Sequence, residues 1–353
     1  MNRKITLVRS RFFDTTPDLA LLQCMEEDVA RSGRFDIAWG APIFRPRAVA
    51  VRFWTLLHRI WRQLPQRQKQ GAIVSLGLSS SNYLYSKTFP HFARPYQKRV
   101  LWCYDVWEPQ WKSMESLVRD ARIDILLLSS WAATQHFRTL KFENLAPEDI
   151  HWLPETINAQ RYQSSAWHDR EIDVLSFGRN YSRFHQAMES SGAAKHFRYD
   201  FQGKNQGHTG GENADTDTGR NGMKSVKLQF PTHGDLVRGL ANSKICICFP
   251  RSTTHPDLTG QVSTTTLRYL QAMSANCLIL GNTTQDLEHM LPYNPVVEVD
   301  WNDPVGQISH ILANPASYQS LIERNSQTVR DLFSIEYAIS FIESAIKKHS
   351  SRQ

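Results

Sequence analysis

The sequence predicts an α/β protein built from two doubly wound parallel-sheet domains. Three observations lead to this prediction. Short runs rich in β-branched and leucine residues alternate with longer segments whose apolar residues recur at helical spacing, which is the pattern of βαβ units. The alternation starts again near residue 171. The chain of 353 residues, of which 41% are hydrophobic, is long enough to fill two ordinary cores.

Six short apolar runs in the first half predict strands. They span residues 5–9, 35–39, 72–78, 99–104, 123–129 and 151–153. The segments 18–32 and 110–121 separate some of these runs and carry apolar residues at helical spacing. Leu22, Met25 and Val29, for example, fall on one face of a helix.

The second half repeats this pattern. Its predicted strands span residues 171–178, 225–230, 243–249, 276–280 and 296–299, and helices are predicted at 315–332 and 335–348. A polar connector that follows Pro154 and extends to Asp169 marks the boundary between the halves. We therefore expect an N-terminal domain of residues 1–158 and a C-terminal domain of residues 159–353.

Residues 202–224 are almost free of apolar side chains. Such a segment cannot bury enough surface to offset the entropy that it loses on ordering. We interpret it as a flexible insertion in the second domain. Asp215 and Asp217 within it have the D-x-D spacing of some metal sites, but that motif needs a strand end to hold both carboxylates toward the metal. A solvated loop is the favoured interpretation.

The five cysteines indicate neither a disulfide framework nor a metal centre, because their number is odd and they are scattered along the chain. Cys246 and Cys248 lie in an apolar run of strand length, with no second pair to complete a zinc site. We expect no metal site. The sequence has no signal-peptide pattern and no apolar run of roughly 18 residues, which predicts a cytoplasmic protein.

The chain is basic, with a formal charge of +7. A positive charge of this size suits acidic partners, which include nucleotide diphosphates, anionic lipid surfaces and nucleic acid. The sign of the charge does not choose among them. No basic recognition motif for nucleic acid is recognisable, so we expect no nucleic-acid partner.

Two segments of the second half carry a family resemblance. Residues 247–251 and 262–280 resemble the donor-site core of the group 1 (GT-B) glycosyltransferases, in which a strand and a loop lead to a helix close to Glu-Ala-Met-Ala-Cys-Gly. The corresponding helix here reads Gln-Ala-Met-Ser-Ala-Asn over residues 271–276. Arg268 and residues 286–288 look most like the spore-maturation-type branch of the family. Weaker similarities at 127–137, 151–158 and 173–179 extend the resemblance over about residues 98–345.

The resemblance implies two Rossmann-like domains that face a cleft. The C-terminal domain would bind a nucleotide-diphosphate sugar as the donor substrate, with no cofactor and no metal, and the N-terminal domain would bind the acceptor. The acceptor would be a glycan, a lipid-linked saccharide or a similar hydroxyl compound. The resemblance also implies a step of cell-surface polysaccharide synthesis. The alternative is a catalytically degenerate GT-B-like chain that acts as a binding or partner subunit.

The expected donor-binding residues lie at two places. Ser263, Thr264 and Thr265 precede a predicted helix, whose free N–H groups and positive end suit a diphosphate, although the three residues are also ordinary helix caps. Arg179 follows Gly178 at the carboxyl end of a predicted strand, where ligands of open α/β sheets bind. A guanidinium there suits a diphosphate, but a surface arginine is the alternative.

Three further residues complete the expected donor site: Arg183, Arg268 and Gln271. Group 1 members commonly carry two glutamates about eight positions apart, and the matching positions here are Ser263 and Gln271. Gln271 can still hydrogen-bond to ribose hydroxyls. Ser263 supplies no carboxylate, and this departure favours the degenerate-subunit alternative.

Transfer to a hydroxyl by an inverting route needs a base, and Asp105 is the first candidate. It ends the predicted strand 99–104 in surroundings that include Trp102, Trp107 and Trp111, whose rings could support a sugar or simply pack in a core. Asp105 could instead cap the following helix. Glu155 is the second candidate.

The segment 45–69 reads as an amphipathic helix with many arginines. Phe53, Leu56, Leu57 and Ile60 recur at helical spacing. Two interpretations stay open: a helix that lies in an anionic membrane surface, which would place the protein peripherally at the inner membrane, and a helix packed on the sheet of the first domain.

Overall fold

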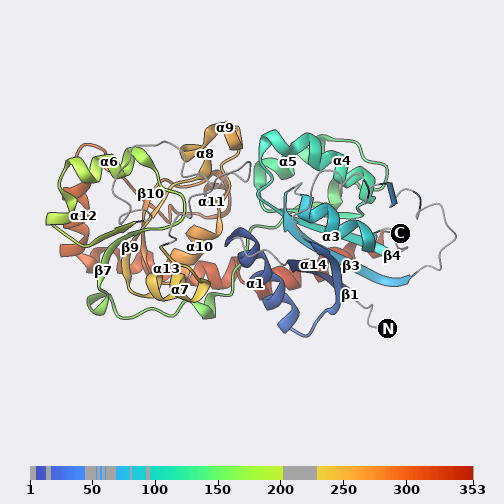
Figure 1. Ribbon diagram of the computed structural model, residues 1–353, viewed down its shortest axis with the longest axis horizontal. Helices are drawn as coiled ribbons and strands as arrows, with labels where there is room; N and C mark the ends of the chain where they lie inside the picture. Colours follow the sequence, from blue (N-terminus) through green and yellow to red (C-terminus); the bar gives the residue numbers. More distant parts are fainter. Residues whose placement is uncertain are drawn as a thin grey trace.

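The computed structural model describes residues 5–12, 17–43, 53, 56–57, 60, 69–79, 82–92, 96–201 and 229–352. Two separate parallel sheets, each flanked by helices, form two lobes that lie side by side (Figure 1). The predicted α/β architecture is therefore confirmed. The expected insertion at 202–224 and most of the segment 45–69 lie outside the described residues.

The first sheet has the order β2-β1-β3-β4-β5-β6, and every neighbouring pair is parallel. Its strands are β1 (Ile5–Phe12), β2 (Asp36–Ile43), β3 (Lys69–Leu78), β4 (Tyr96–Tyr104), β5 (Ile125–Leu128) and β6 (Ile150–Trp152). The helices that connect them are α1 (Pro17–Arg31), α3 (Asn82–Phe92), α4 (Trp111–Ala121) and α5 (Trp131–Thr139).

The second sheet has the order β11-β10-β9-β7-β8, again with parallel neighbours. Its strands are β7 (Ile172–Ser176), β8 (Tyr199–Phe201), β9 (Ser243–Cys248), β10 (Leu278–Gly281) and β11 (Val297–Glu298). Its helices are α6 (Ser182–Ser190), α7 (His233–Ala241), α8 (Arg251–Thr254), α9 (Pro256–Thr259), α10 (Leu267–Ser274), α11 (Gln285–Met290), α12 (Pro304–Ala313) and α13 (Gln319–Leu332).

Both sheets follow the same winding rule. In each lobe the first strand in the chain, β1 or β7, lies between the second strand and the third, and the later strands follow outward from the third. The direction of winding therefore reverses beside β1 and beside β7. In open α/β sheets, ligands bind at the carboxyl ends of the strands at such a switch point.

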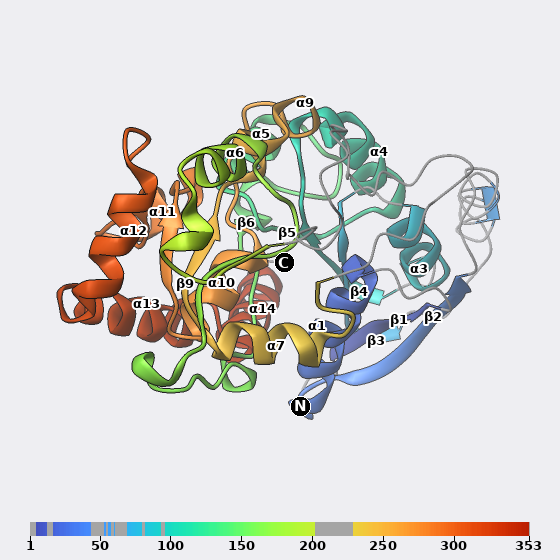
Figure 2. The ribbon, with the colours of Figure 1, turned by 60° about the vertical axis from the view of Figure 1, so that its left-hand side comes forward.

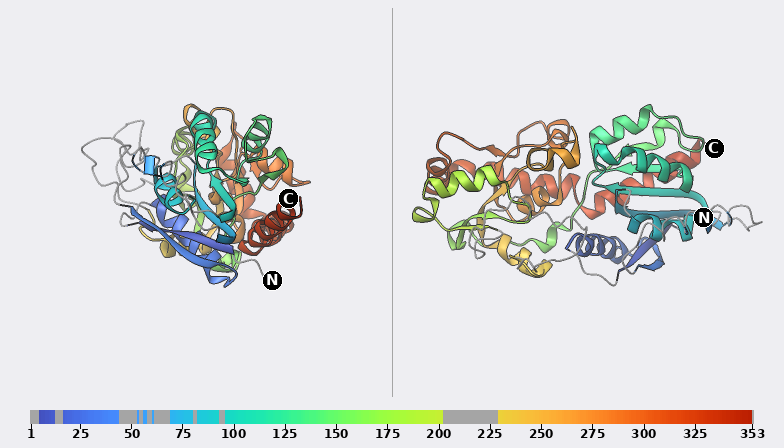
Figure 3. Two further views of the ribbon diagram at one scale, coloured as in Figure 1. Left: turned by 90° about the vertical axis from the view of Figure 1, so that its right-hand side faces the viewer. Right: turned by 45° about the horizontal axis from the view of Figure 1, so that its top comes forward.

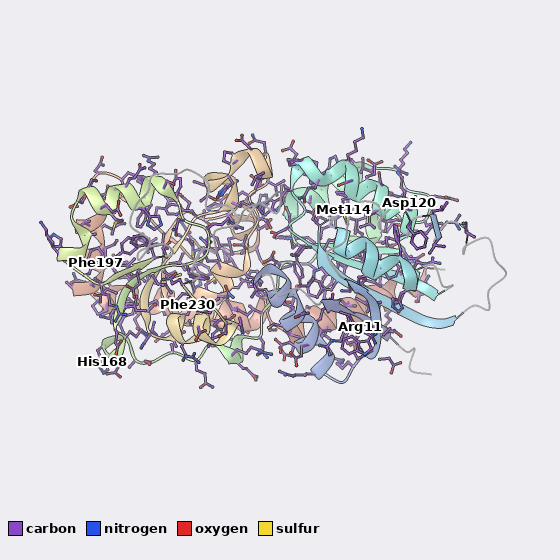
Figure 4. All side chains as sticks on the ribbon, viewed as in Figure 1. Arg11, Met114, Asp120, His168, Phe197 and Phe230 are labelled. Carbon is purple, nitrogen blue, oxygen red and sulfur yellow. The ribbon has the colours of Figure 1, made fainter. Side chains whose placement is uncertain are left out.

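Helices cover both faces of each sheet, which explains why the strand sequences are almost continuously apolar. In β4, Val100 and Trp102 belong to one core cluster, whereas Leu101 and Cys103 belong to the cluster on the opposite face. The second sheet is likewise sandwiched between two clusters. Met114 and Phe197, labelled in Figure 4, come from the cores of different lobes.

The last helix, α14 (Ile335–Ser351), packs on the first sheet. Its apolar residues Ile335, Ile339 and Ile342 lie in the same core cluster as β4 and β5. Near its end, His349 Nδ1 lies 2.9 Å from a carboxylate oxygen of the buried Asp149, just before β6. Both views of Figure 3 draw this red helix beside strands of the first sheet. The expected unit of residues 159–353 thus includes a helix whose apolar face belongs to the core of the first sheet.

One strand differs from the sequence prediction. Ten of the strands coincide with predicted runs, but β8 (Tyr199–Phe201) was not predicted. Of the predicted strand at 225–230, residues 225–228 lie outside the described residues, and 229–230 form a bend. The short β8 sits at the edge of the sheet and has only three residues, so its alternation is too brief to stand out in the sequence.

Candidate active site

The carboxyl ends of the two sheets meet at the junction of the lobes. The main-chain N–H of Trp131, which begins α5 after strand β5, donates to Asp286 Oδ1 at 2.9 Å from α11, which follows β10. Nearby, the N–H of Gln261 donates to Glu108 Oε2 at 2.8 Å. Figures 1 and 2 show α9 of the second lobe facing α5 of the first. Loops from both sheets therefore contribute to one site.

Asp105 lies at this junction with a strained backbone. It follows β4 with a φ of 53°, and Ser79, which follows β3, has a φ of 37°. The N–H of Ser79 donates to the carbonyl oxygen of Tyr104 at 2.7 Å, so the two strained positions are neighbours. Left-handed conformations cost residues with a side chain about 1–3 kcal/mol and cluster at functional sites, where the surrounding structure enforces them.

Glu155, which follows β6, is 4% exposed and points to the same place. Burial raises the pKa of its carboxyl group well above the usual value, and the nearby charges of Asp105 and Asp286 raise it further. The main-chain N–H of Leu267 and the positive charge of Arg179 oppose this rise. The structure thus brings the two catalytic candidates together and places both near an arginine of the second lobe.

Arg179 and Arg268 line the second lobe's side of the site. Arg268 Nη1 donates to the carbonyl oxygen of Arg179 at 2.9 Å, and its guanidinium lies 5.5 Å from the ring centre of Phe177. Gly178 has a φ of 70°, and a Cβ there would lie 2.8 Å from Arg268 Nη2. Only glycine therefore fits easily between the end of β7 and this guanidinium.

The loop of residues 263–266, here called the 263–266 loop, is held by its own hydroxyls. Thr264 Oγ1 donates to Asp286 Oδ2 at 2.5 Å, and the N–H of Thr265 donates to the same oxygen at 2.9 Å. The hydroxyls of Thr265 and Thr284 share a hydrogen bond of 2.6 Å. Thr264 and Thr265 are buried, whereas Ser263 is partly exposed. The threonine side chains therefore shape the loop in this conformation.

Two predicted residues point away from this group. Gln271 Nε2 donates to the hydroxyl of Tyr162 at 3.1 Å, and this hydroxyl lies 3.0 Å from His233 Nε2. Burial raises the pKa of Tyr162 to about 12, so its hydroxyl stays neutral. Arg183 on α6 lies over the ring of Trp301, 4.1 Å from its centre. The structure does not bring these two side chains together with Asp105 and Glu155.

The tryptophans near Asp105 serve the core. Trp102 and Trp107 are 1% and 2% exposed, and Trp102 Nε1 donates to the carbonyl oxygen of Leu153 at 3.3 Å. Trp111 stacks on His136 with ring centres 4.0 Å apart. Cys246 and Cys248 are also fully buried in the second lobe. Packing is the role that the structure gives to all five of these side chains.

Sequence reasoning missed the bridging roles of Asp286, Glu108 and Tyr162. Asp286 entered the sequence argument only through its family resemblance, and Glu108 and Tyr162 have no motif of their own. Each one binds a group that is distant in the chain. Among the described residues, no group of three or more His, Cys, Asp or Glu side chains is arranged to hold a metal. Within the same residues, no helix is long and apolar enough to cross a membrane.

Comparison with solved structures identifies the architecture. Sucrose-phosphate synthase from Thermosynechococcus elongatus matches with a TM-score of 0.59 at 11% sequence identity, over 100% of both chains. HepE from Anabaena, in complex with UDP-glucose, matches with a TM-score of 0.57 at 9% identity, over 99% of this chain and 100% of HepE.

The α,α-trehalose-phosphate synthase (UDP-forming) from Burkholderia vietnamiensis matches with a TM-score of 0.56 at 12% identity, over 98% of this chain and 100% of the synthase. These proteins are GT-B glycosyltransferases. The chain has the GT-B fold. No protein-family model and no curated protein sequence matches it. In this GT-B fold, the residues gathered above come from the carboxyl ends of both sheets, which face one another.

Proposed function

We propose that this GT-B protein transfers a sugar from a nucleotide-diphosphate sugar to a hydroxyl group of an acceptor. One observation carries the proposal. Asp105 and Glu155 of the first lobe interact with each other beside Arg179 of the second lobe, and the N–H that begins α10 reaches the same place. A base and a binding site for an anionic leaving group therefore stand next to each other, as glycosyl transfer requires.

In the proposed reaction, the acceptor oxygen forms a bond to the anomeric carbon while the bond from that carbon to the diphosphate breaks. Asp105 takes the acceptor proton. Arg179 and the N-terminus of α10 stabilise the negative charge that develops on the diphosphate, because a guanidinium and free N–H groups bind phosphate oxygens well. Arg268 holds the main chain of Arg179 in place.

Glu155 has a different role in this proposal. Its raised pKa keeps it protonated to a higher pH than an exposed glutamate. A protonated carboxyl group can donate a hydrogen bond to a phosphate oxygen at the start of α10. We assign proton abstraction to Asp105, with Glu155 as the second candidate.

We propose a uridine diphosphate sugar as the donor. The HepE structures are complexes with UDP and glucose and with UDP-glucose, and the trehalose-phosphate synthase is described as UDP-forming. We also propose that no metal ion and no cofactor take part, because Arg179 and the start of α10 offer positive charge for the diphosphate. Ser263, Thr264 and Thr265 would then shape the loop, and Gln271 would need to leave Tyr162 to reach the ribose.

The acceptor proposal rests on the sequence. The likeness of Arg268 and residues 286–288 to the spore-maturation-type branch, with the basic segment 45–69, supports a glycan or lipid-linked saccharide as the acceptor. We propose a place in cell-surface polysaccharide synthesis, with the protein in the cytoplasm and peripheral at the inner face of the membrane.

A thermal-shift screen against nucleotide diphosphates and their sugars tests the donor proposal. A ligand at 100 times its dissociation constant stabilises the folded protein by about 2.7 kcal/mol, so UDP and one UDP-sugar should raise the melting temperature. Release of UDP from the stabilising sugar, unchanged by a chelator, would then support a metal-independent transferase. Binding without any release of UDP would favour a degenerate binding subunit, and no stabilisation by any nucleotide would contradict the proposal.

A further inference from the structure

Asp286 connects three separate segments with one carboxyl group. It lies in the first turn of α11 and is 3% exposed. Oδ1 accepts the N–H of Trp131 from the first lobe, whereas Oδ2 accepts the hydroxyl of Thr264 and the N–H of Thr265 from the 263–266 loop. Each carboxylate oxygen therefore serves a different lobe.

The helix that carries Asp286 does not need it as a cap. Thr284 is the N-cap residue of α11, and its hydroxyl oxygen accepts the N–H of Leu287 at 3.2 Å. The three hydrogen bonds that Asp286 accepts go instead to other elements. Burying a carboxyl group costs free energy unless it is hydrogen-bonded. Because the bonds of Asp286 go to other elements, its burial serves the contacts with those elements and not the capping of α11.

A second contact joins the same two helices. The ring of Trp131 stacks on His289, one turn after Asp286, with ring centres 3.8 Å apart and an angle of 26° between the planes. Trp131 thus meets α11 through its main chain and through its side chain. His289 is exposed, and its Nδ1 lies 2.8 Å from the carbonyl oxygen of Gln285 on the same helix.

We propose that Asp286 is a positioning residue that couples the conformation of the 263–266 loop to the contact between the lobes. If the loop or α5 moved alone, one oxygen of a buried carboxylate would lose its hydrogen-bond partner, which is unfavourable. A movement of the 263–266 loop and a movement of α5 are therefore favoured together. Because coupling is reciprocal, a donor that binds best to the ordered loop also strengthens the contact at Trp131. This inference rests on the proposed donor site.

The test uses the full chain labelled with 5-fluorotryptophan, whose Trp131 signal is assigned with Trp131→Phe. UDP affinity is measured by calorimetry, and the fluorine signal is followed as UDP is added. In the unsubstituted protein we expect UDP to shift the Trp131 signal. In Asp286→Asn, an NH₂ group replaces one acceptor, so we expect about tenfold weaker binding and no shift of the signal at saturating UDP.

His289→Gln is the second variant, since the exposed position should not disturb folding. It weakens the stack on Trp131 without touching the loop, so coupling predicts a several-fold loss of UDP affinity. Asp331→Asn and His310→Gln, exposed positions on α13 and α12, are the matched controls and should leave affinity unchanged.

The outcomes separate the two proposals. If UDP does not bind the unsubstituted protein, the proposed donor site is wrong, and the proposed coupling is then wrong as well. If UDP binds, and both variants keep the affinity and the Trp131 shift of the unsubstituted protein, the donor site stands and Asp286 is a structural residue only. Unchanged affinity in His289→Gln alone would also overturn the coupling, because the lobe contact would then have no influence on the loop.

Discussion

The carboxyl group of Glu155, at the end of the first sheet, lies close to the main-chain N–H of Leu267, the first residue of α10 in the second lobe, and this N–H lowers the pKa of Glu155. The start of α10 was predicted to bind an anion of the donor. In this structure a carboxyl group of the chain itself stands at that N–H. Asp105, Asp286 and Arg179 surround it, so its protonation depends on both lobes.

Glu155→Gln should change how stability depends on pH. A carboxyl group whose pKa is higher in the folded protein keeps its proton there after the unfolded chain has lost it, so stability falls as pH rises above the ordinary value of 4.5. The neutral amide removes this loss. We expect the melting temperature of the variant to rise relative to the unsubstituted protein between pH 5 and pH 8. Parallel curves, as expected for the exposed control Glu298→Gln, would contradict the prediction.

Arg179→Ala should weaken binding of a nucleotide diphosphate by about 1.5–3 kcal/mol, the range for hydrogen bonds to charged groups, with the fold intact. The guanidinium lies close enough to Glu155 to lower the pKa of that residue, which places it at the start of α10. Calorimetry with UDP measures the loss. Arg119→Ala, an exposed position paired with Glu115 on α4, is the control, and equal affinity in both variants would show that Arg179 does not bind the donor.

Asp105→Asn should lower sugar transfer strongly and spare donor binding, because a base is needed only when the acceptor reacts. The amide keeps the size of the side chain at a position whose φ of 53° asparagine tolerates well. Rates of transfer and the dissociation constant of the donor are measured in parallel. Full transfer activity in the variant would move the role of the base to another group or to the substrate.

Arg170→Ala should destabilise the second lobe. Arg170 is 5% exposed, and its guanidinium donates to the carbonyl oxygens of Ser165, Ser243 and Asn276 at 2.9, 2.8 and 2.9 Å. The bond to Ser243 is buried and the other two are part-buried, and a buried carbonyl that loses its hydrogen-bond partner costs about 1–3 kcal/mol. Denaturant unfolding should show a loss of at least about 2 kcal/mol.

Arg170→Lys separates charge from geometry, because a lysine keeps the charge but cannot reach the same carbonyls in a planar fork. We expect it to recover only part of the lost stability. Arg330→Ala on the exposed face of α13 should change stability little. A loss for Arg170→Ala no larger than that of Arg330→Ala would contradict the prediction.

The protein should co-sediment with anionic liposomes at low salt and much less at high salt. Phe53, Leu56 and Ile60 are 56%, 57% and 50% exposed, so the apolar side chains described there are available to a lipid surface. Each arginine near an anionic surface adds about 1 kcal/mol. Replacing the three apolar residues by serine should reduce binding. Protein that stays in the supernatant at low salt would indicate a soluble acceptor.

The strands are the elements that the sequence predicts best. Runs such as Val100 to Tyr104 are apolar at every position because helices cover both faces of the sheet, and this property is visible in a single segment. The restart of the alternation near residue 171 likewise predicted the second sheet. By contrast, the sequence of α14 does not show that this helix packs on the first sheet, because an apolar helix face can pack in the core of either lobe.

The sequence alone determined the two parallel sheets and placed Asp105, Glu155 and Arg179 at the carboxyl ends of strands, since local periodicity sets where strands end. Only the tertiary structure decided which of these ends meet. In the folded protein, Asp286 accepts a hydrogen bond from Trp131 across the lobes, and Gln271 donates a hydrogen bond to Tyr162. Contacts of this kind depend on how two separately folded sheets pack against each other, and that packing has no signature within any one segment of the chain.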